Sequence, residues 1–168
     1  MRLRPYIPSR DFDIVRGWVT DRREHALWCA DRFCYPLERE NFDSVLAAHS
    51  ERFTDCAFVA TEDNGRPLGF FCYSVNTATN EGMLKFVVND PLKRGRGIGK
   101  EMISLALRYA FDITKAVSVK LFVFDCNIPA QKCYINAGFT EAEKDSSAFM
   151  FGEEEWYRCL MIKNKEDS

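Results

Sequence analysis

The stretch Arg94-Gly95-Arg96-Gly97-Ile98-Gly99-Lys100 has the composition of a loop that binds a phosphate group. Glycines allow the backbone to approach a ligand without side-chain clashes, and the flanking arginines and lysine can form charge-assisted hydrogen bonds with an anion. An amphipathic segment follows, and the unpaired N–H groups at the start of a helix favour anions. These features predict a binding site for a diphosphate.

Two common phosphate-binding motifs do not fit this loop. A Walker A loop requires four residues between its first glycine and Gly-Lys, followed by Ser or Thr. Here only three residues separate Gly95 from Gly99, and Glu101 follows Lys100. The dinucleotide fingerprint would require a glycine at position 100 and a place near the first strand of a βαβ array. A plain tight turn is the remaining alternative, and four basic residues among positions 93–100 count against it.

The loop and a second segment both resemble the GNAT superfamily of acetyltransferases. Arg94-x-x-Gly97-x-Gly99 is similar to the Q/R-x-x-G-x-G/A motif, which in that superfamily follows the fourth strand and binds the pyrophosphate of acetyl-CoA. The segment NIPAQKCYINAGF, at 127–139, resembles the segment that follows the fifth strand. The resemblance covers about residues 56–140, whereas residues 1–55 match only in general layout.

The resemblance implies a role for each matching residue. Tyr134 would be the general acid, and the remaining matches would contact acetyl-CoA. The implied cofactor-binding residues are Val87, Val88, Arg94, Gly95, Arg96, Gly97, Ile98, Gly99, Lys100, Asn127 and Ala130.

The chemistry of Tyr134 agrees with the implied role. On helix pattern alone this tyrosine would be an amphipathic residue with its hydroxyl bonded to backbone, and its spacing from Asn127 favours catalysis instead. A phenol has a pKa near ~10 and a thiol near ~8.5. The values are close enough for Tyr134 to protonate a departing thiolate.

The implied reaction is direct attack of a primary amine on the acetyl carbonyl in a ternary complex, with no metal. A backbone N–H near Val88 would stabilise the oxyanion. The general base stays open between Glu81, Glu38 and an ordered water, with Glu40 as a weaker candidate beside Glu38. His49 continues an apolar helical stripe, which predicts a packed residue rather than a base.

The elements that must position these residues follow from hydrophobic periodicity. Helices are predicted from Asp11 as an N-cap to Val19, and over 37–50, 99–113 and 129–136. Strands are predicted over 2–7, 56–61, 68–76, 82–88 and 117–125, with a last hairpin of 147–151 and 156–162. This order predicts an α/β fold, GNAT-like, in one domain of residues 1–168: a mixed, mostly antiparallel sheet of about seven strands with flanking helices.

Composition excludes several classes of function. The net charge is −2, which gives no reason to expect nucleic acid or an anionic membrane as a partner. No apolar run reaches the roughly 20 residues of a membrane span, and the N-terminus lacks a signal peptide, so we expect a cytoplasmic protein. Seven cysteines without CxxC spacing argue against zinc and disulfides. Most of them lie in apolar stretches and are predicted to be small core residues in a reducing compartment, and Cys126 and Cys133 are predicted to be structural.

The acceptor is less well defined than the cofactor. A small-molecule amine, a protein N-terminus and a lysine all remain open, and a homodimer is suggested by the resemblance alone. Glu153, Glu154 and Glu155 could attract a cationic amine, although a solvated turn is the expected reading. The alternative function is a non-catalytic acyl-CoA-binding or sensor module, which would keep residues 94–99 and would not need Tyr134. The last residues, NKEDS, are predicted to form a frayed tail.

Overall fold

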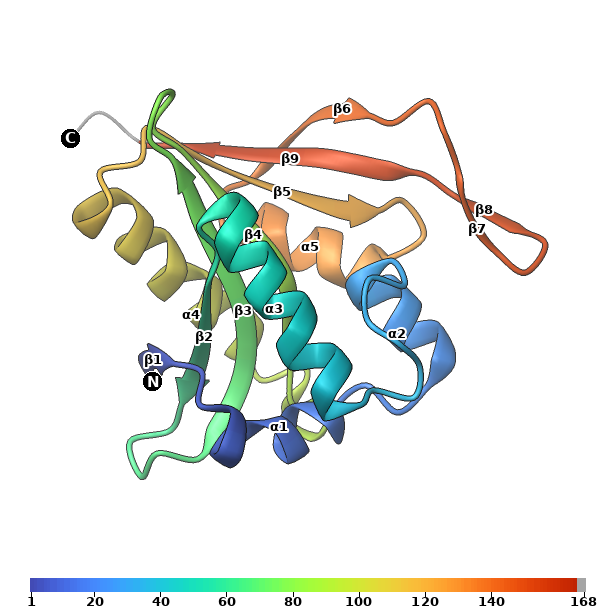
Figure 1. The fold of residues 1–168 in the computed structure, drawn as a ribbon. Helices are drawn as coiled ribbons and strands as arrows, with labels where there is room; N and C mark the ends of the chain where they lie inside the picture. Colours follow the sequence, from blue (N-terminus) through green and yellow to red (C-terminus); the bar gives the residue numbers. More distant parts are fainter. Residues whose placement is uncertain (166–168) are drawn as a thin grey trace.

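A computed structural model describes residues 1–165 and contains a seven-stranded sheet in the order β1-β2-β3-β4-β5-β9-β6 (Figure 1). Among the described strands β4 and β5 form the only parallel pair, and all other neighbours are antiparallel. The predicted mixed, mostly antiparallel sheet is therefore confirmed. The strands are β1 Arg2–Pro5, β2 Cys56–Thr61, β3 Pro67–Asn76, β4 Glu81–Asn89, β5 Ser118–Phe124, β6 Thr140–Lys144 and β9 Arg158–Asn164.

Helices cover both faces of the sheet. The α-helices are α1 Pro8–Arg16, α2 Arg22–Cys29, α3 Arg39–Phe53, α4 Ile98–Arg108 and α5 Ile128–Asn136, with a 3₁₀ turn at Pro91–Lys93 and a π-helical turn at Tyr109–Ile113. Consecutive residues of a strand point to opposite faces. Phe70 of β3 packs with Phe42 of α3 in one core cluster, whereas Phe71 packs with Ile103 of α4 in the other. In Figure 1, α1 and α3 accordingly lie in front of the sheet, and α4 lies behind it.

The N-terminal helices differ from the prediction. Asp11 is not an N-cap, because α1 begins at Pro8 and the buried Asp11 carboxylate accepts hydrogen bonds from Arg4 at 2.7 Å and from the Ile7 N–H at 2.8 Å. Helix α2 was not predicted. Its signal was present, since Asp21 is a favourable N-cap residue and accepts a hydrogen bond from the Glu24 N–H at 2.9 Å.

The predicted C-terminal hairpin is wrong. Residues 149–151 form β7 (Phe149–Phe151), which pairs with β8 (Glu154–Trp156) as a separate two-stranded ribbon. Strand β9 instead enters the main sheet between β5 and β6, where its apolar Cys159 and Met161 are buried against the α4 side. Strand β6 escaped prediction because its sequence TEAEK is exposed throughout and has no hydrophobic alternation.

Two smaller expectations also change. Asn164 belongs to β9, so the predicted tail begins too early, and residues 166–168 lie outside the described part of the chain. All seven cysteines are free, but only Cys29, Cys72 and Cys159 are buried, so most cysteines are not core residues. Within residues 1–165, every helix is too short or too polar to cross a lipid bilayer.

Candidate active site

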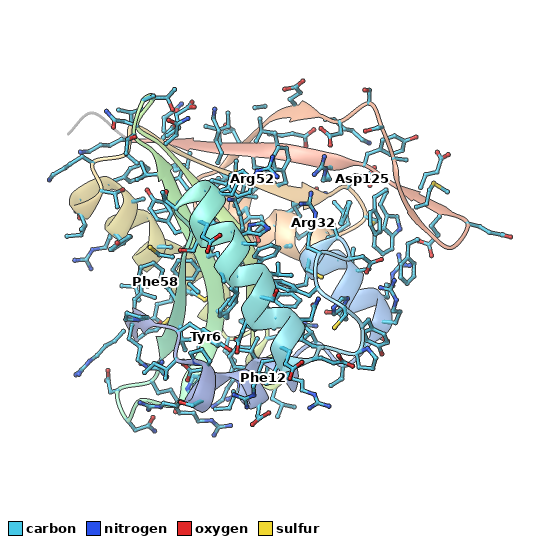
Figure 2. The ribbon with its side chains drawn as sticks, viewed as in Figure 1. Tyr6, Phe12, Arg32, Arg52, Phe58 and Asp125 are labelled. Carbon is cyan, nitrogen blue, oxygen red and sulfur yellow. The ribbon has the colours of Figure 1, made fainter. Side chains whose placement is uncertain are left out.

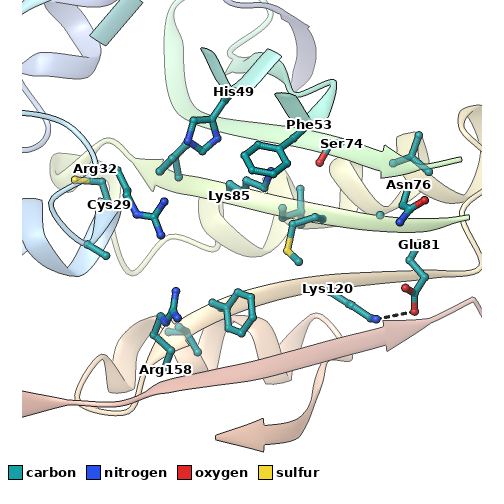
Figure 3. A pocket seen from close by; sticks show the side chains of 18 of the residues that line it. Cys29, Arg32, His49, Phe53, Ser74, Asn76, Glu81, Lys85, Lys120 and Arg158 are labelled. Carbon is teal, nitrogen blue, oxygen red and sulfur yellow. Dashed lines mark ion pairs between the residues drawn. The ribbon is translucent and has the colours of Figure 1, made fainter. Parts of the chain in front are cut away.

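Strands β4 and β5 separate after a short stretch of pairing, and this separation creates the candidate site. They pair only from Glu81↔Ser118 to Met83↔Lys120. Beyond these pairs a cleft of about 570 Å³ is lined by both strands together with α2, α4 and α5, and we call it the α4–α5 cleft. A second cavity of about 720 Å³, the α3 pocket, lies on the α3 side of the same strands (Figure 3).

A bulge in β4 lies at the border of the two cavities. Phe70 of β3 pairs with Val88 and Cys72 pairs with Lys85, so Phe71 alone faces both Phe86 and Val87. Phe86 has a φ of +52°, which is uncommon for a bulky residue. Surrounding packing holds it there, since its ring lies 4.7 Å from that of Phe33. A bulge leaves one residue unpaired in the ladder, and the pairing of β4 with β5 has already ended at Met83.

The α4–α5 cleft brings together nearly all of the residues predicted to bind the cofactor. Arg96 is the exception and does not line the cleft. The predicted residues that line it are Val87, Val88, Arg94, Gly95, Gly97, Ile98, Gly99, Lys100, Asn127, Ala130 and Tyr134.

The glycines of the loop have two different structural roles. Gly95 and Gly97 have φ angles of +76° and +79°, and a Cβ at either position would have no atom within 4 Å. They therefore provide backbone freedom and leave open space for a ligand. Gly99 instead permits close helix packing, because a Cβ there would lie 3.1 Å from the Cys133 Sγ of α5.

The start of α4 offers unpaired hydrogen-bond donors. Gly97 is the N-cap, and the first N–H that bonds back along the helix is that of Glu101, which donates to the Gly97 carbonyl at 3.0 Å. The N–H groups of residues 98–100 thus precede the intrahelical hydrogen bonds, and these residues line the cleft. Donors and open space in one place fit an anion such as a diphosphate.

The basic residues of the loop have unequal surroundings. The Arg94 guanidinium lies 2.7 Å from the Glu24 carboxylate of α2, and both side chains are about half exposed. Lys93 pairs with Glu62 at 3.4 Å. Within residues 1–165, neither Arg96 nor Lys100 forms an ion pair. Arg94, which was predicted to bind the pyrophosphate, is therefore paired with Glu24 of α2.

Tyr134 is buried in α5 and lines the α4–α5 cleft. Its hydroxyl forms no hydrogen bond with any group of residues 1–165. The alternative role, an amphipathic residue with its hydroxyl bonded to backbone, is therefore not what the structure shows. Burial raises the pKa of Tyr134, and the nearby Cys133 raises it to a smaller extent. The hydroxyl therefore keeps its proton at neutral pH. Asn127 begins the same helix by accepting a hydrogen bond from the Ala130 N–H at 3.3 Å.

The carboxylates considered as general bases have different positions. Glu81 lines the α3 pocket, and its Oε1 lies 2.6 Å from Lys120 Nζ (dashed line in Figure 3). This hydrogen bond lowers the pKa of Glu81, which makes the carboxylate a weaker proton acceptor. Glu38 and Glu40 are exposed at the start of α3 and line neither cavity.

His49 packs against the rings of Phe53 and Phe86, as predicted from its helical stripe, and it also borders a cavity. It lines the α3 pocket, and its Nδ1 lies 3.1 Å from the carboxylate of the buried Asp55. The other oxygen of Asp55 accepts a hydrogen bond from Lys85 Nζ at 2.7 Å. Thr54, with a φ of +59°, ends α3 and turns the chain so that Asp55 faces back toward the helix. No local sequence pattern predicts this arrangement, because Lys85 belongs to a strand that is distant in the chain.

The second histidine and the two cysteines near α5 have no surroundings that would make them reactive. His25 is fully buried, and burial lowers its pKa. Cys133 lines the α4–α5 cleft, and burial raises the pKa of its thiol, which does not favour a nucleophile. Cys126 is exposed. Residues 1–165 contain no group of three or more His, Cys, Asp or Glu side chains that could hold a metal ion.

Comparison with known proteins gives one family and several similar structures. Residues 21–139 match the acetyltransferase (GNAT) family, a range that begins well before the predicted resemblance and includes α2 and α3. Mycothiol acetyltransferase of Tsukamurella paurometabola is 37% identical over 84 residues, or 49% of this chain, and the match spans 28% of that protein's length.

Two solved structures share the fold over almost the whole chain. The spermidine N-acetyltransferase from Vibrio cholerae, in complex with CoA and spermine, has a TM-score of 0.81 and 19% identity, covering 97% of this chain and 94% of that one. A structure provisionally named a phosphinothricin N-acetyltransferase has a TM-score of 0.78 and 20% identity, covering 99% of both chains.

Proposed function

Because the chain belongs to the acetyltransferase (GNAT) family, we propose that it transfers the acetyl group of acetyl-CoA to a primary amine, as a single acetyltransferase domain. One observation carries the proposal. Unpaired helix donors, open glycine positions and the free hydroxyl of Tyr134 line one cleft, which shares the wall formed by Leu84 and Phe122 with the α3 pocket. The spermidine N-acetyltransferase with the same fold, solved with CoA, supports the choice of cofactor.

In this proposal the α4–α5 cleft holds acetyl-CoA, which supplies the acetyl group as a thioester. The N–H groups at the start of α4 and the side chains of Arg94 and Lys100 hold the pyrophosphate. The backbone of Val87 and Val88 lies along the pantetheine arm in the manner of an added strand. Asn127 and Ala130 contact the cofactor from the start of α5.

The amine enters from the α3 pocket and attacks the carbonyl carbon of the thioester directly. A nitrogen–carbon bond forms and the carbon–sulfur bond breaks, so the amine must lose a proton and the thiolate must gain one. A backbone N–H of the bulge near Val88 stabilises the oxyanion. Tyr134 gives its proton to the sulfur, and its free hydroxyl in the cleft supports this role.

We propose His49 as the base that receives the proton of the amine, either directly or through an ordered water. It lines the α3 pocket, and its hydrogen bond to Asp55 orients the ring. Glu81, the carboxylate candidate in the same pocket, already pairs with Lys120. His49→Gln should lower kcat, whereas the matched Glu81→Gln should have the smaller effect, and the reverse order would assign the base to Glu81.

The alternative, a non-catalytic acyl-CoA-binding module, is tested by two measurements on the same protein. Thermal unfolding with and without acetyl-CoA measures binding, because a ligand of the native state adds RT ln(1 + [L]/Kd), about 2.7 kcal/mol at 100 Kd. Release of CoA thiol in the presence of a panel of small primary amines measures transfer. Stabilisation with thiol release supports the enzyme, and stabilisation without thiol release for any amine supports the binding module.

A further inference from the structure

We propose that the acceptor amine also carries an oxyanion, such as a carboxylate or phosphinate, which binds Arg32 and Arg52 in the α3 pocket. This inference rests on the proposed acetyl transfer and adds the chemical class of the acceptor. The balance of charge along the pocket wall supports it. Both arginines lie on the same side of the molecule, on the α3 side of β5 (Figure 2), and both line the pocket.

Most of the charged side chains in this wall already have partners. Three of the five cationic residues that line the pocket lie within 3 Å of a carboxylate, and these pairs are neutral overall. They are Lys85 with Asp55 at 2.7 Å, Lys120 with Glu81 at 2.6 Å, and Arg158 with Asp145 at 2.8 Å.

Arg32 and Arg52 are the two cations that remain. Neither forms an ion pair or a side-chain hydrogen bond with any group of residues 1–165. The carboxylate nearest to Arg32 in sequence, Asp31, is held by two hydrogen bonds from Arg22, at 2.7 and 2.8 Å. Arg52 lies over the ring of Phe53, at 5.0 Å from its centroid, a contact that does not neutralise the guanidinium.

The geometry suits a small ligand with two polar ends. Figure 3 shows Arg32 and Arg158 pointing into the gap between β4 and β5, with His49 and Phe53 above them on α3. Arg52 follows His49 by three residues, so the two side chains lie on the same side of α3. An amine near His49 would therefore place an attached oxyanion within reach of Arg52. Phe53, Phe86 and Phe122 supply the apolar surface between these ends.

A polyamine would find little to hold it in this pocket. Glu81 is the only acidic residue of the described chain that lines the pocket, and Lys120 already neutralises it. The acidic turn at 153–155 does not line the pocket, and Glu154 pairs with Arg23 at 2.6 Å. Because a concave site concentrates the field of its charges, two unpaired guanidinium groups favour anions and repel cations.

The test compares ligands that differ in charge and little in shape. Methionine and methioninamide share a side chain and an amine, and phosphinothricin and spermidine extend the comparison. Binding is followed by the fluorescence of Trp28, which lines both cavities, and transfer is followed by release of CoA thiol. We expect methionine and phosphinothricin to bind at least ~10-fold more tightly than methioninamide and spermidine, the magnitude of one charge-assisted contact.

Variants assign the effect to the two arginines. Arg32→Gln and Arg52→Gln should each remove most of the preference for the anionic ligand, by raising its KM and leaving kcat nearly unchanged. Arg52→Glu should reverse the preference toward spermidine. Arg108→Gln, in α4 and outside both cavities, is the matched control and should leave the preference intact.

The two proposals fail in different ways. Tighter binding of spermidine or methioninamide, no saturable binding of any anionic amine, or an unchanged preference in both arginine variants would each overturn the anionic acceptor. Arginine-dependent binding of anionic amines without thiol release would leave the acceptor class standing and contradict the proposed acetyl transfer.

Discussion

The two cavities that meet at β4 and β5 are built from different parts of the chain. The α4–α5 cleft is lined by backbone N–H groups and glycines of one short loop, residues 94–100, with a few side chains of α5. The α3 pocket depends on charged side chains drawn from α3, β4, β5, β9 and the segment that follows α2. They share a wall that includes Trp28, Leu84 and Phe122.

This difference has a consequence for substitutions. A backbone donor survives the replacement of most side chains, so acetyl-CoA binding in the cleft should tolerate change except where a glycine conformation or Arg94 is lost. The α3 pocket has no such protection, because each of its charges belongs to one side chain. Substitutions in the two cavities should therefore separate into effects on acetyl-CoA affinity and effects on the acceptor.

The largest expected effect lies in the cleft, at the reacting atoms. Tyr134→Phe should lower kcat by about 10²–10⁴-fold, because the proton for the departing sulfur is lost. Thermal stabilisation by acetyl-CoA should be nearly unchanged. Steady-state thiol release measures kcat, and thermal unfolding measures the stabilisation by acetyl-CoA. Tyr157→Phe removes a hydroxyl that lines neither cavity and serves as the control. A kcat for Tyr134→Phe equal to that of the control would remove the general-acid role.

The next effect is on stability and concerns the wall of the α3 pocket. Asp55→Ala leaves Lys85 and His49 without their buried partner and should lower the free energy of unfolding by about 3 kcal/mol. Asp145→Ala breaks the more exposed pair with Arg158 and should cost less than about 1 kcal/mol. Urea denaturation compares the two. Equal losses would show that the Asp55 cluster is not a structural part of the wall.

A smaller effect tests the loop itself. Arg94→Ala should weaken acetyl-CoA binding roughly tenfold, the magnitude of a charge-assisted hydrogen bond, and leave the acceptor KM unchanged. Arg96→Ala removes the same charge two positions further along the chain. The Arg96 side chain does not line the cleft, so this substitution should have little effect. Isothermal titration of acetyl-CoA distinguishes them. A greater loss for Arg96→Ala would overturn the cleft assignment of Arg94.

The smallest effect concerns the contact between α2 and the loop. Glu24→Gln frees Arg94 from its exposed ion pair, so acetyl-CoA should bind about two- to fivefold more tightly, in line with the value of surface ion pairs. The same titration measures it, and Glu62→Gln, which frees Lys93 outside the cleft, is the control. Weaker binding in Glu24→Gln would mean that the ion pair positions Arg94 for its ligand.

Local signals account for the parts of the fold that could be predicted. Helix α4 was visible from its apolar stripe and the glycines before it, and the predicted helix 129–136 matches α5, which ends just before Gly138 with its φ of +91°. Strand β6 carries no such signal, because all of its residues are exposed and its pairing with β9 determines that it is a strand. The pairing of β9 with β5 likewise depends on residues that are far apart in the chain.

The sequence by itself determined the glycine-rich loop before α4 and the place of Tyr134 in α5, because backbone conformation and helix caps depend on neighbouring residues. Only the tertiary structure decided the α3 pocket. His49, Asp55 and Lys85 meet because the end of α3 folds onto β4. Whether Arg32 or Arg52 carries an unpaired charge likewise depends on where every carboxylate lies in space. Pairing of charges falls off with distance in three dimensions and not with separation along the chain.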